Sequence, residues 1–525
     1  MSRRPGPYPV PAGVGRVATV PTPQLTDPAT SRWSVLATSL GDVLADLDPT
    51  DLLLAVPVPA EGLAGHQEAA AALALVGLDA GDVAAAHEPS SEAGATTRLP
   101  LVPGERAART VLLVGVGAGT PADLRTAGAA LGRAGRGRAD LVMAAGALAP
   151  DAAAALAEGI ALGGYTSPRW LSEGATPSKA PATAVTLVGS VDEPAVRRAV
   201  ARARATMLAR NLAVVPSNTK NPGWMAAQAR TIGRRTGLDV RVWSDRDLRA
   251  EGFGGLLAVG AGSVTPPRLV QLSYSPRGAT SATPQVVLVG KGITFDTGGL
   301  DIKPAEGMLA MKTDMSGSAV VLAVLAACRD LEVPVRVTGL LALAENAVGG
   351  ASYRPSDVVT MYGGRTVEIG NTDAEGRMVM ADALAYADAH LDPDVLLDIA
   401  TLTGAARVAL GRTMAPVYAT DDALGEALVA AGRATGELLW PFPLVEDYRP
   451  SLDSPVADVN HIAGTPVGAG SITAALFLRE FVGERRWAHL DIAGVGRSDV
   501  DRGLLTKGGT GFGARLLLTW LEEMA

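Results

Sequence analysis

Four short segments in the second half of the chain are almost continuously apolar, and longer helical patterns separate them. A strand covered on one face alternates apolar with polar residues, whereas a strand covered on both faces is apolar throughout. The pattern therefore predicts a largely parallel sheet between two layers of helices. The four predicted strands are QVVLVG (285–290), VRVTGLLALA (335–344), DVLLDIA (394–400) and WAHLDIA (487–493).

The first 200 residues show a different pattern, in which short apolar runs alternate with alanine-rich helical stretches. TVLLVGVGAG (110–119) predicts a buried strand that ends in a tight, glycine-rich turn. Its glycines alone are a weak dinucleotide-binding signal, and no acidic partner follows at a convincing distance. Because 525 residues exceed the size of one core, we predict a two-domain α/β protein. A smaller domain over 31–200 and a larger three-layer α/β/α domain over 201–525 follow a Pro/Gly-rich arm at 1–30.

Polar residues follow three of the predicted strands at the point where each strand ends. Lys291–Asp296 follows the first strand, Glu345–Asn346 the second and Thr401–Gly404 the third. Open α/β sheets bind ligands at the carboxyl ends of their strands, because the loops there converge on one edge. We therefore expect a functional site at this edge of the larger domain.

The overall composition excludes several classes of protein. With 48% hydrophobic and 19% charged residues, the chain is typical of a compact globular protein rather than a disordered one. A formal net charge of -8 and a sequence pI of about 5.3 provide no broad basic surface for nucleic acid. Local arginine runs such as Arg133–Arg138 nevertheless leave a smaller nucleic-acid-binding patch open.

Targeting and redox features favour a cytoplasmic protein. Cys328 is the single cysteine, so no intramolecular disulfide can form, and its apolar helical neighbours predict a buried, inert thiol. The N-terminal MSRRPGPYPVPAGVG has proline and glycine where a signal peptide has an apolar segment. No uncharged apolar run approaches about 18 residues, so we predict no membrane span.

The heptad Asn-Thr-Asp-Ala-Glu-Gly-Arg at 371–377 is the most informative chemical feature. It places Asp373 and Glu375 two residues apart, before a predicted helix over 378–391. Residues two apart on a regular helix do not face each other. The carboxylates can therefore converge only if the heptad is a loop or cap, with Thr372 or Asp373 as the N-cap. The alternative is an ordinary helix N-terminus, which also tolerates carboxylates.

A second group of charged residues lies among glycines in the segment 290–314, where lysine, a scarce residue in this chain, is concentrated. Its members are Lys291, Asp296, Lys303 and Asp314. Together with the heptad they place four carboxylates in one expected cleft, and ionised carboxylates gather only where cations neutralise them. We therefore predict two divalent metal ions, which would activate water and polarise the carbonyl group that the water attacks.

The expected ligands indicate which metals the site would bind. Carboxylates suit zinc, manganese or magnesium, and a neutral lysine amine favours zinc or another transition metal. The histidines show no zinc-like spacing and are interpreted as surface or packing residues. They are His66, His87, His390, His461 and His489.

Three basic residues near the predicted ligands receive different interpretations. Lys303 is placed to stay protonated and to stabilise a tetrahedral oxyanion, and an ordinary surface lysine is the alternative. Arg377 could bind a substrate carboxylate or a small oxyanion such as bicarbonate, and a salt bridge that holds the loop is the alternative. Lys312 is interpreted as structural.

An ordered set of motifs resembles the leucyl aminopeptidase family, of the cytosol aminopeptidase type. The resemblance covers about 285–495, whereas 1–30 and parts of 31–150 show none and EGIALGGY (158–165) only a weak one. The motifs are GKGITFDTGG (290–299), Lys303-Pro304, MKTDMSG (311–317), NTDAEGR (371–377), ATLTGA (400–405) and WAHLDIAG (487–494).

The resemblance implies a two-metal enzyme, using zinc or manganese, that removes N-terminal residues, leucine-like ones preferred, from peptides. One ion would be held by Asp296, Asp373 and Glu375. Asp296 and Glu375 would also bind the second ion and so bridge the pair. Lys291 and Asp314 would complete the ligands of that second ion, to which the free amine of the substrate would bind.

The same resemblance implies roles for residues around the metals. Lys303 would polarise the scissile carbonyl, and Arg377 would hold a bicarbonate that acts as general base. Family members are typically hexamers with a macro-like N-terminal domain, so we expect a homo-oligomer. The residues that would contact the substrate are Lys291, Asp296, Lys303, Met311, Asp314, Thr401 and Gly404.

Three departures from the family pattern concern pocket shape and subunit contacts rather than chemistry. Met378 stands where leucine is usual, a volume-conserving change, and 211–222 is a loose version of the family's entry into the larger domain. The stretch after Gly494 is also less similar to the family. A DNA-binding regulator on the same scaffold is the second hypothesis, against which the acidic pI argues. An inactive scaffold is disfavoured, because every matched ligand position carries its expected residue.

Overall fold

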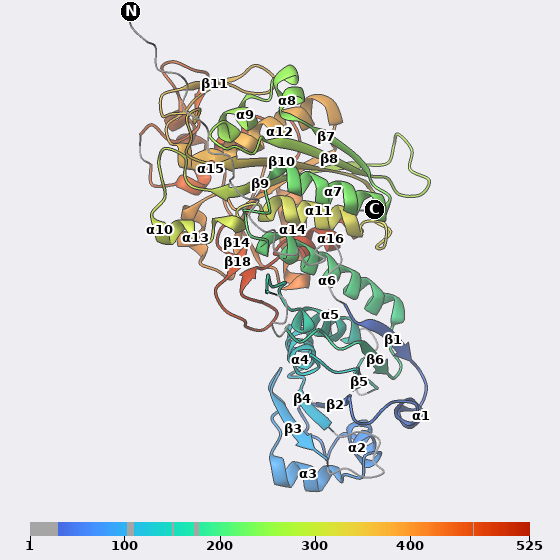
Figure 1. Cartoon of the computed structure of the whole chain (residues 1–525). Helices are drawn as coiled ribbons and strands as arrows, with labels where there is room; N and C mark the ends of the chain where they lie inside the picture. The colour runs from blue at the N-terminus through green and yellow to red at the C-terminus, as the bar shows by residue number, and fades with distance from the viewer. Residues whose placement is uncertain are drawn as a thin grey trace, which may run out of the picture.

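The computed structural model describes residues 30–101, 110–146, 148–149, 152–172, 178–465 and 467–524, so the arm predicted at 1–30 falls almost wholly outside the described residues. The described chain forms two domains, each built around its own sheet, and helix α6 (Glu193–Val214) runs between them (Figure 1). The predicted boundary between residues 200 and 201 falls inside α6 and stays a prediction.

The smaller domain contains a six-stranded sheet that is parallel except at one edge. In order across the sheet its strands are β1 (Arg32–Leu36), β6 (Ala184–Val188), β5 (Asp140–Ala144), β2 (Leu52–Val58), β4 (Thr110–Gly115) and the antiparallel β3 (Thr96–Pro100). Its helices are α1 (Leu40–Ala45), α2 (Gln67–Ala74), α3 (Ala80–His87), α4 (Pro121–Ala134) and α5 (Ala152–Gly164). Leu53 and Leu54 of β2 belong to cores on opposite faces, so helices cover both sides of this sheet.

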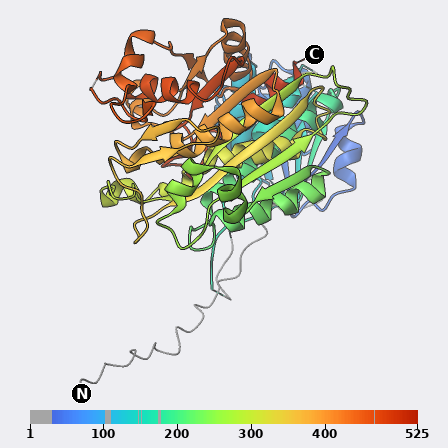
Figure 2. The ribbon, with the colours of Figure 1, turned by 90° about the horizontal axis from the view of Figure 1, so that it is seen from above.

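The larger domain contains an eight-stranded sheet. In order its strands are β15 (Leu439–Pro441), β14 (Ala415–Ala419), β17 (Trp487–Asp491), β13 (Val395–Ala400), β9 (Gln285–Asp296), β10 (Arg336–Asn346), β8 (Arg268–Tyr274) and β7 (Asp239–Trp243). The four central strands are parallel, and antiparallel pairs flank them. Figure 2 shows these strands side by side in the turned view. The predicted, largely parallel sheet is confirmed.

Short strands and helices complete the larger domain. The short strands are β11 (Val358–Thr360), β12 (Thr366–Glu368), β16 (Val459–Asn460), β18 (Arg497–Ser498) and β19 (Gly508–Gly509). The α-helices are α7 (Pro222–Thr236), α8 (Asp245–Glu251), α9 (Gly254–Gly260), α10 (Ala305–Met308), α11 (Ser316–Ala327), α12 (Glu375–Leu391), α13 (Gly404–Leu410), α14 (Asp422–Thr435), α15 (Gly470–Arg479) and α16 (Ala514–Glu522). The 3-10 helices are η1 (Met311–Thr313), η2 (Thr372–Ala374) and η3 (Glu446–Leu452).

Strand β9 lies between two hydrophobic cores, and this position explains why its sequence is continuously apolar. Val286 and Leu288 pack into one core with α6, α7, α11, α14 and α16, whereas Val287 and Val289 pack into the other with α8, α9, α12 and α15. Successive side chains of a strand point to opposite faces, and here both faces are covered. The predicted three-layer arrangement is confirmed.

Strand β9 is longer than its apolar pattern predicts. The pattern ends at Gly290, but β9 continues to Asp296 because its parallel pairing with β10 continues to the pair Asn346–Asp296. Lys291 and Asp296 therefore lie within the strand rather than after it, and the prediction that the strand ends at residue 290 is wrong. Backbone pairing does not depend on the polarity of the side chain, which is why the pattern ended too early.

One helical run in the described residues, Ala305–Ala327, is long and apolar enough by length and composition to cross a membrane. The qualifying window is 72% buried inside the protein, as expected for a core helix. Most of this run is α11, which packs against β9 and α6. Cys328, directly after α11, is buried as predicted, and burial raises the pKa of its thiol.

Buried charges join the two domains. Arg515 of α16 contacts Glu158 of α5 at 2.5 Å and Glu437 at 3.3 Å, so one guanidinium binds carboxylates from both domains. Arg125 of α4 adds a contact of 3.1 Å to the same Glu158 oxygen. These side chains are at most 9% exposed. Each charge depends on the others, because an unpaired buried charge is strongly unfavourable.

The substitution Glu158→Gln is expected to lower the free energy of unfolding by about 3 kcal/mol, because it leaves Arg125 and Arg515 without their shared carboxylate. The measurement is chemical denaturation of the purified variant, followed by circular dichroism. The matched control is Glu193→Gln, which removes an exposed pair with Arg197 on α6 and should change stability little. Equal stability of the two variants would contradict the interpretation.

Candidate metal centre

A bulge at the end of β9 places Lys291 and Asp296 on one side of the sheet. Residues five apart on a regular strand point to opposite faces. Between Ile293 and Asp296, however, β9 contains three steps while its partner β10 contains two, from Ala344 to Asn346. One extra residue in a strand reverses the alternation beyond it. Both side chains therefore point into the same cavity.

The heptad at 371–377 is a short 3-10 helix followed directly by an α-helix. The residue that caps η2 is Asn371, whose side chain accepts a 2.7 Å hydrogen bond from the Asp373 N–H. The prediction of Thr372 or Asp373 as N-cap is therefore wrong. Helix α12 begins at Glu375 rather than at 378, so Glu375 lies on its first turn. The change from η2 to α12 lets two carboxylates two residues apart line one cavity.

Thr372 fixes the heptad to the loop that follows β9. Its N–H donates to Asp301 Oδ2 at 2.7 Å, and its hydroxyl donates to the Gly298 carbonyl at 2.7 Å. The loop itself is closed by a bond from the Lys303 N–H to the Thr297 carbonyl at 2.9 Å. Lys303 is thereby held near the heptad although 70 residues separate them in sequence.

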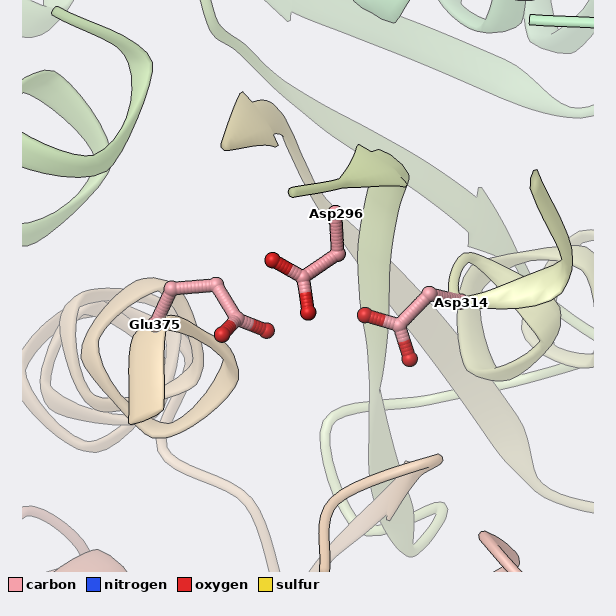
Figure 3. A group of neighbouring side chains, drawn as sticks. All are labelled: Asp296, Asp314 and Glu375. Atoms are coloured by element: carbon pink, nitrogen blue, oxygen red, sulfur yellow. The ribbon is translucent and has the colours of Figure 1, made fainter. Parts of the chain in front are cut away.

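Three carboxylates meet at the centre of the site (Figure 3). Asp296, Asp314 and Glu375 each place an oxygen within 4.8 Å of the others. They come from three different elements: β9, the residue after η1, and α12. Two lysines lie among these carboxylates and the nearby Asp373, and neutralise part of the negative charge.

Each lysine connects two carboxylates. Lys291 Nζ lies 2.8 Å from Asp314 Oδ2 and 2.9 Å from Glu375 Oε1, and it also donates to the Thr401 carbonyl at 2.9 Å. Lys303 Nζ lies 2.9 Å from Asp296 Oδ2 and contacts Asp373.

Burial and crowding shift the acid–base properties of this group. Burial, reinforced by Asp296, raises the pKa of Glu375 to about 8, and Lys291 only partly offsets this. Burial likewise raises the pKa of Asp314 to about 6. Burial alone would lower the pKa of Lys291 and of Lys303, but the surrounding carboxylates raise both above the usual range. Both ammonium groups are therefore charged near neutral pH.

The residues present fit a divalent metal site. Two lysines leave four carboxylates only half neutralised, and the raised carboxyl pKa values reflect burial first and the remaining repulsion second. Glu375 Oε2 is buried and has no hydrogen-bond partner among the described residues, so it is free to bind a cation. Carboxylate oxygens are suitable ligands for zinc or manganese, and Lys291 can add its nitrogen as a ligand only after the ammonium group has lost its proton.

Two glycines allow the close approach that the site requires. A Cβ atom on Gly376 of α12 would lie 2.5 Å from Lys291 Cε. A Cβ atom on Gly317 of α11 would lie 2.1 Å from the Ile399 carbonyl oxygen on β13. A larger residue at position 317 would push α11 away from the sheet, and a larger residue at position 376 would displace the Lys291 side chain from its carboxylates.

Two polar side chains position the site. The sequence pattern placed one of them, Asn346, near the site without giving it a role and did not single out the other, Asp491. Asn346 donates to Asp296 Oδ1 at 2.8 Å and to the Thr372 carbonyl at 3.0 Å, and so orients a central carboxylate. Asp491, which is fully buried, accepts bonds from the Thr403 N–H at 3.0 Å, the Thr403 hydroxyl at 2.6 Å and the Leu402 N–H at 3.1 Å. Asp491 thus holds the loop after β13. Its place inside a predicted strand concealed it.

A cavity of about 380 Å³ opens over the carboxylates, within the size range of ligand pockets (about 300–1,000 Å³). It is lined by nine of the ten residues expected to act in the site. They are Lys291, Asp296, Lys303, Met311, Asp314, Asp373, Glu375, Thr401 and Gly404.

Arg377 is the expected site residue that does not line this cavity. It is buried, and its Nη1 donates to the His461 carbonyl at 2.6 Å. Burial lowers its pKa to about 10, and the charges of Glu375 and Asp491 only partly oppose this. Lys312 donates to the Val214 carbonyl at 2.9 Å, in agreement with a structural role.

Comparison with known proteins identifies relatives of both domains. Residues 207–518 match the model of the cytosol aminopeptidase family, catalytic domain, and residues 58–173 match that of its N-terminal domain. A probable cytosol aminopeptidase of Roseiflexus castenholzii is 43% identical over 431 residues, which is 79% of this chain and 87% of that protein. Another, of Micrococcus luteus, is 42% identical over 508 residues, 92% of this chain and 97% of that protein.

Solved structures of similar proteins share the whole fold. A mutant of tomato leucine aminopeptidase aligns with a TM-score of 0.80 and 29% sequence identity, covering 95% of this chain and 98% of that one. The bottromycin maturation enzyme BotP in complex with Mn aligns with a TM-score of 0.78 and 35% identity, covering 90% and 99%.

The substitution Glu375→Gln is expected to weaken Mn²⁺ binding by more than about 100-fold. Loss of a residue that only supports a metal ligand typically weakens metal binding by about 10- to 100-fold, and loss of a ligand itself should weaken it more. The measurements are calorimetric titration with Mn²⁺ and elemental analysis. The matched control, Glu446→Gln, changes an exposed carboxylate that pairs with Arg479 and should leave binding unchanged. Unaltered affinity and stoichiometry of the Glu375 variant would remove this residue from the site.

Proposed function

The chain belongs to the cytosol aminopeptidase family, and from this premise we propose that its cavity holds two divalent metal ions with which it removes leucine-like N-terminal residues from peptides. Its relatives and the family model support metal-dependent aminopeptidase activity. The number of ions, their ligands and the preferred residue are the proposed part.

The observation that supports two ions most strongly is the set of four carboxylates and two lysines in one cavity. Asp296, Asp373 and Glu375 are the proposed ligands of one ion. Asp296 and Glu375 also contribute to the second, and Lys291 and Asp314 complete it. The closeness of Asp296, Asp314 and Glu375 supports the bridging roles. When bound, such ions ionise a water molecule and polarise a carbonyl group.

Lys303 is proposed to stabilise the oxyanion that forms when water attacks the scissile carbonyl. Its side chain lines the cavity and is 18% exposed, so a substrate can reach it. The raised pKa, which its carboxylate neighbours cause against the effect of burial, keeps the ammonium charged. A fixed positive charge in a cavity with little water stabilises a developing negative charge better than water does.

Arg377 is proposed to hold a bicarbonate ion that acts as general base. Its Nε is buried and has no hydrogen-bond partner among the described residues, so a donor is free for an anion. Because Arg377 does not line the cavity directly, such an ion would have to lie between the guanidinium and the carboxylates.

Met311, Thr401 and Gly404 are proposed to form the pocket for the N-terminal side chain. All three line the cavity, and a Cβ atom on Gly404 would meet no atom within 4 Å, so this position faces open space. The thioether of methionine is a flexible, apolar contact for an aliphatic side chain. A leucine-like residue is therefore the proposed preference.

Metal identity, assembly and location complete the proposal. Zinc or manganese is the proposed metal, and the Mn complex of BotP supports manganese. A hexamer is proposed from the family resemblance. Cytoplasmic location is proposed from the names of the relatives, which are cytosol aminopeptidases, and from the single buried, unpaired cysteine. The comparisons do not support the DNA-binding alternative.

Protein stripped of metal by a chelator is expected to lose hydrolysis of leucine amide, and added Mn²⁺ or Zn²⁺ should restore it. The amide cannot be attacked at a useful rate without a polarised carbonyl and an activated water. The control substrate is N-acetyl-leucine amide, whose blocked amine cannot bind at the carboxylates. Equal hydrolysis of both substrates, or full activity without metal, would refute the proposal.

The substitution Asp491→Asn is expected to lower kcat/KM for leucine amide by about 10- to 100-fold, because hydrogen bonds to a charged group contribute about 1.5–3 kcal/mol. Metal stoichiometry should stay unchanged, since Asp491 contacts the 402–403 backbone rather than the proposed ligands. Thr403→Val, which removes one of these bonds, should show a smaller effect in the same direction. The control is Asp453→Asn at an exposed position. Normal kcat/KM in the Asp491 variant would exclude a positioning role.

A further inference from the structure

Three arginines line the same cavity as the carboxylate cluster, and no part of the proposed reaction uses them. They are Arg407 on α13, Arg412 just after it, and Arg497 on β18, here called the arginine wall. The other charged residues that line the cavity are the two lysines and four carboxylates already described. The described lining residues therefore form a carboxylate-rich floor, with Asp296, Asp314, Asp373 and Glu375, and a wall whose charged lining residues are all arginines.

Close backbone packing holds the arginine wall together. A Cβ atom on Gly494 would lie 2.2 Å from the Gly411 carbonyl oxygen and 3.5 Å from Arg407 Cα. The loop after β17 thus packs directly on the end of α13, and this contact brings Arg497 to the cavity that Arg407 also lines, although 90 residues separate them. The wall is a built feature of the fold rather than a group of unrelated surface residues.

The positive charge of the wall is not fully paired. Arg412 and Arg497 both contact Asp499, so one carboxylate serves two guanidiniums. Arg407 is exposed, and its guanidinium makes no hydrogen bond or ion pair with the residues that the structure describes. An unpaired guanidinium has several donors in a planar array that matches a carboxylate.

We propose that the arginine wall binds a carboxylate that the peptide carries after its first residue, so that the enzyme prefers substrates with negative charge downstream of the bond it cleaves. This inference rests on the proposed aminopeptidase function. The free amine of a peptide goes to the carboxylate floor, so residues further along the chain, at about 3.3–3.6 Å each, extend toward other parts of the cavity. A carboxylate there meets guanidiniums that can bind it with two parallel hydrogen bonds.

Two kinds of peptide supply such a carboxylate, and matched substrates distinguish them. An acidic side chain is tested with Leu-Glu-Gly-amide against Leu-Gln-Gly-amide and Leu-Lys-Gly-amide. A free C-terminus is tested with Leu-Gly-Gly against Leu-Gly-Gly-amide. In either arm we expect kcat/KM to be about 5- to 20-fold higher for the carboxylate-bearing peptide, a charge-assisted contact reduced by solvent exposure. A preference in one arm only identifies the source.

The variants Arg407→Gln and Arg497→Gln are expected to reduce this ratio of kcat/KM values toward one, and Arg407→Lys to retain part of it. The matched control is Arg230→Gln, on the exposed side of α7, which should keep the full ratio. In the unaltered enzyme, raising the salt concentration from 0.05 to about 0.5 M should also lower the ratio, because exposed charges are screened.

The results separate failure of this inference from failure of the proposed function. An enzyme that hydrolyses leucine amide but cleaves Leu-Glu-Gly-amide and Leu-Gln-Gly-amide equally, and the two forms of Leu-Gly-Gly equally, has no carboxylate-selecting wall. The same holds if the preference exists but survives in both glutamine variants. An enzyme that hydrolyses none of these substrates with any metal would instead refute the proposed function.

Discussion

The structure of the larger domain depends on how it holds several carboxylates close together at buried positions. Asp296, Asp314 and Glu375 approach within 4.8 Å of one another at buried positions, where like charges repel strongly. Lys291 and Lys303 offset this repulsion, because each lies between two carboxylates. The raised pKa of Glu375, due to burial and to Asp296, indicates that the compensation is incomplete. A divalent cation is the group that completes it.

Close packing makes this arrangement possible. The glycine of α11 lets that helix approach the sheet, the glycine of α12 leaves room for the Lys291 side chain, and the bulge in β9 turns Asp296 to the same side as Lys291. The junction between the domains uses the same principle of shared charge. There Arg515 binds Glu158 and Glu437 at once, so the two domains are joined by charges that are buried but paired. In both places each charged group is supported by residues distant in sequence.

Much of this structure could be predicted from the sequence. The features that could not be predicted escaped for physical reasons. The apolar strands and the charged motifs at their ends predicted the sheet, its layers and the carboxylates and lysines that line the cavity, and the family resemblance added Met311, Thr401 and Gly404. The bulge in β9 left no signal, because it depends on pairing with β10 rather than on local sequence. Asp491 was hidden in a strand pattern. The arginine wall was hidden because arginine is common throughout this chain, so only its position in space distinguishes it.

The two charged regions of the cavity differ in burial, and this difference suits different tasks. Three of the four carboxylates of the floor, Asp296, Asp314 and Glu375, are buried, so their interactions are strong, weakly screened by salt and fixed in geometry. Such a floor is suited to hold ions and to accept the amine that every peptide has. Arg407 is exposed, so its interactions are weaker and depend on what the rest of the substrate carries. A buried floor can thus serve the common chemistry, while an exposed wall can select among substrates without disturbing it.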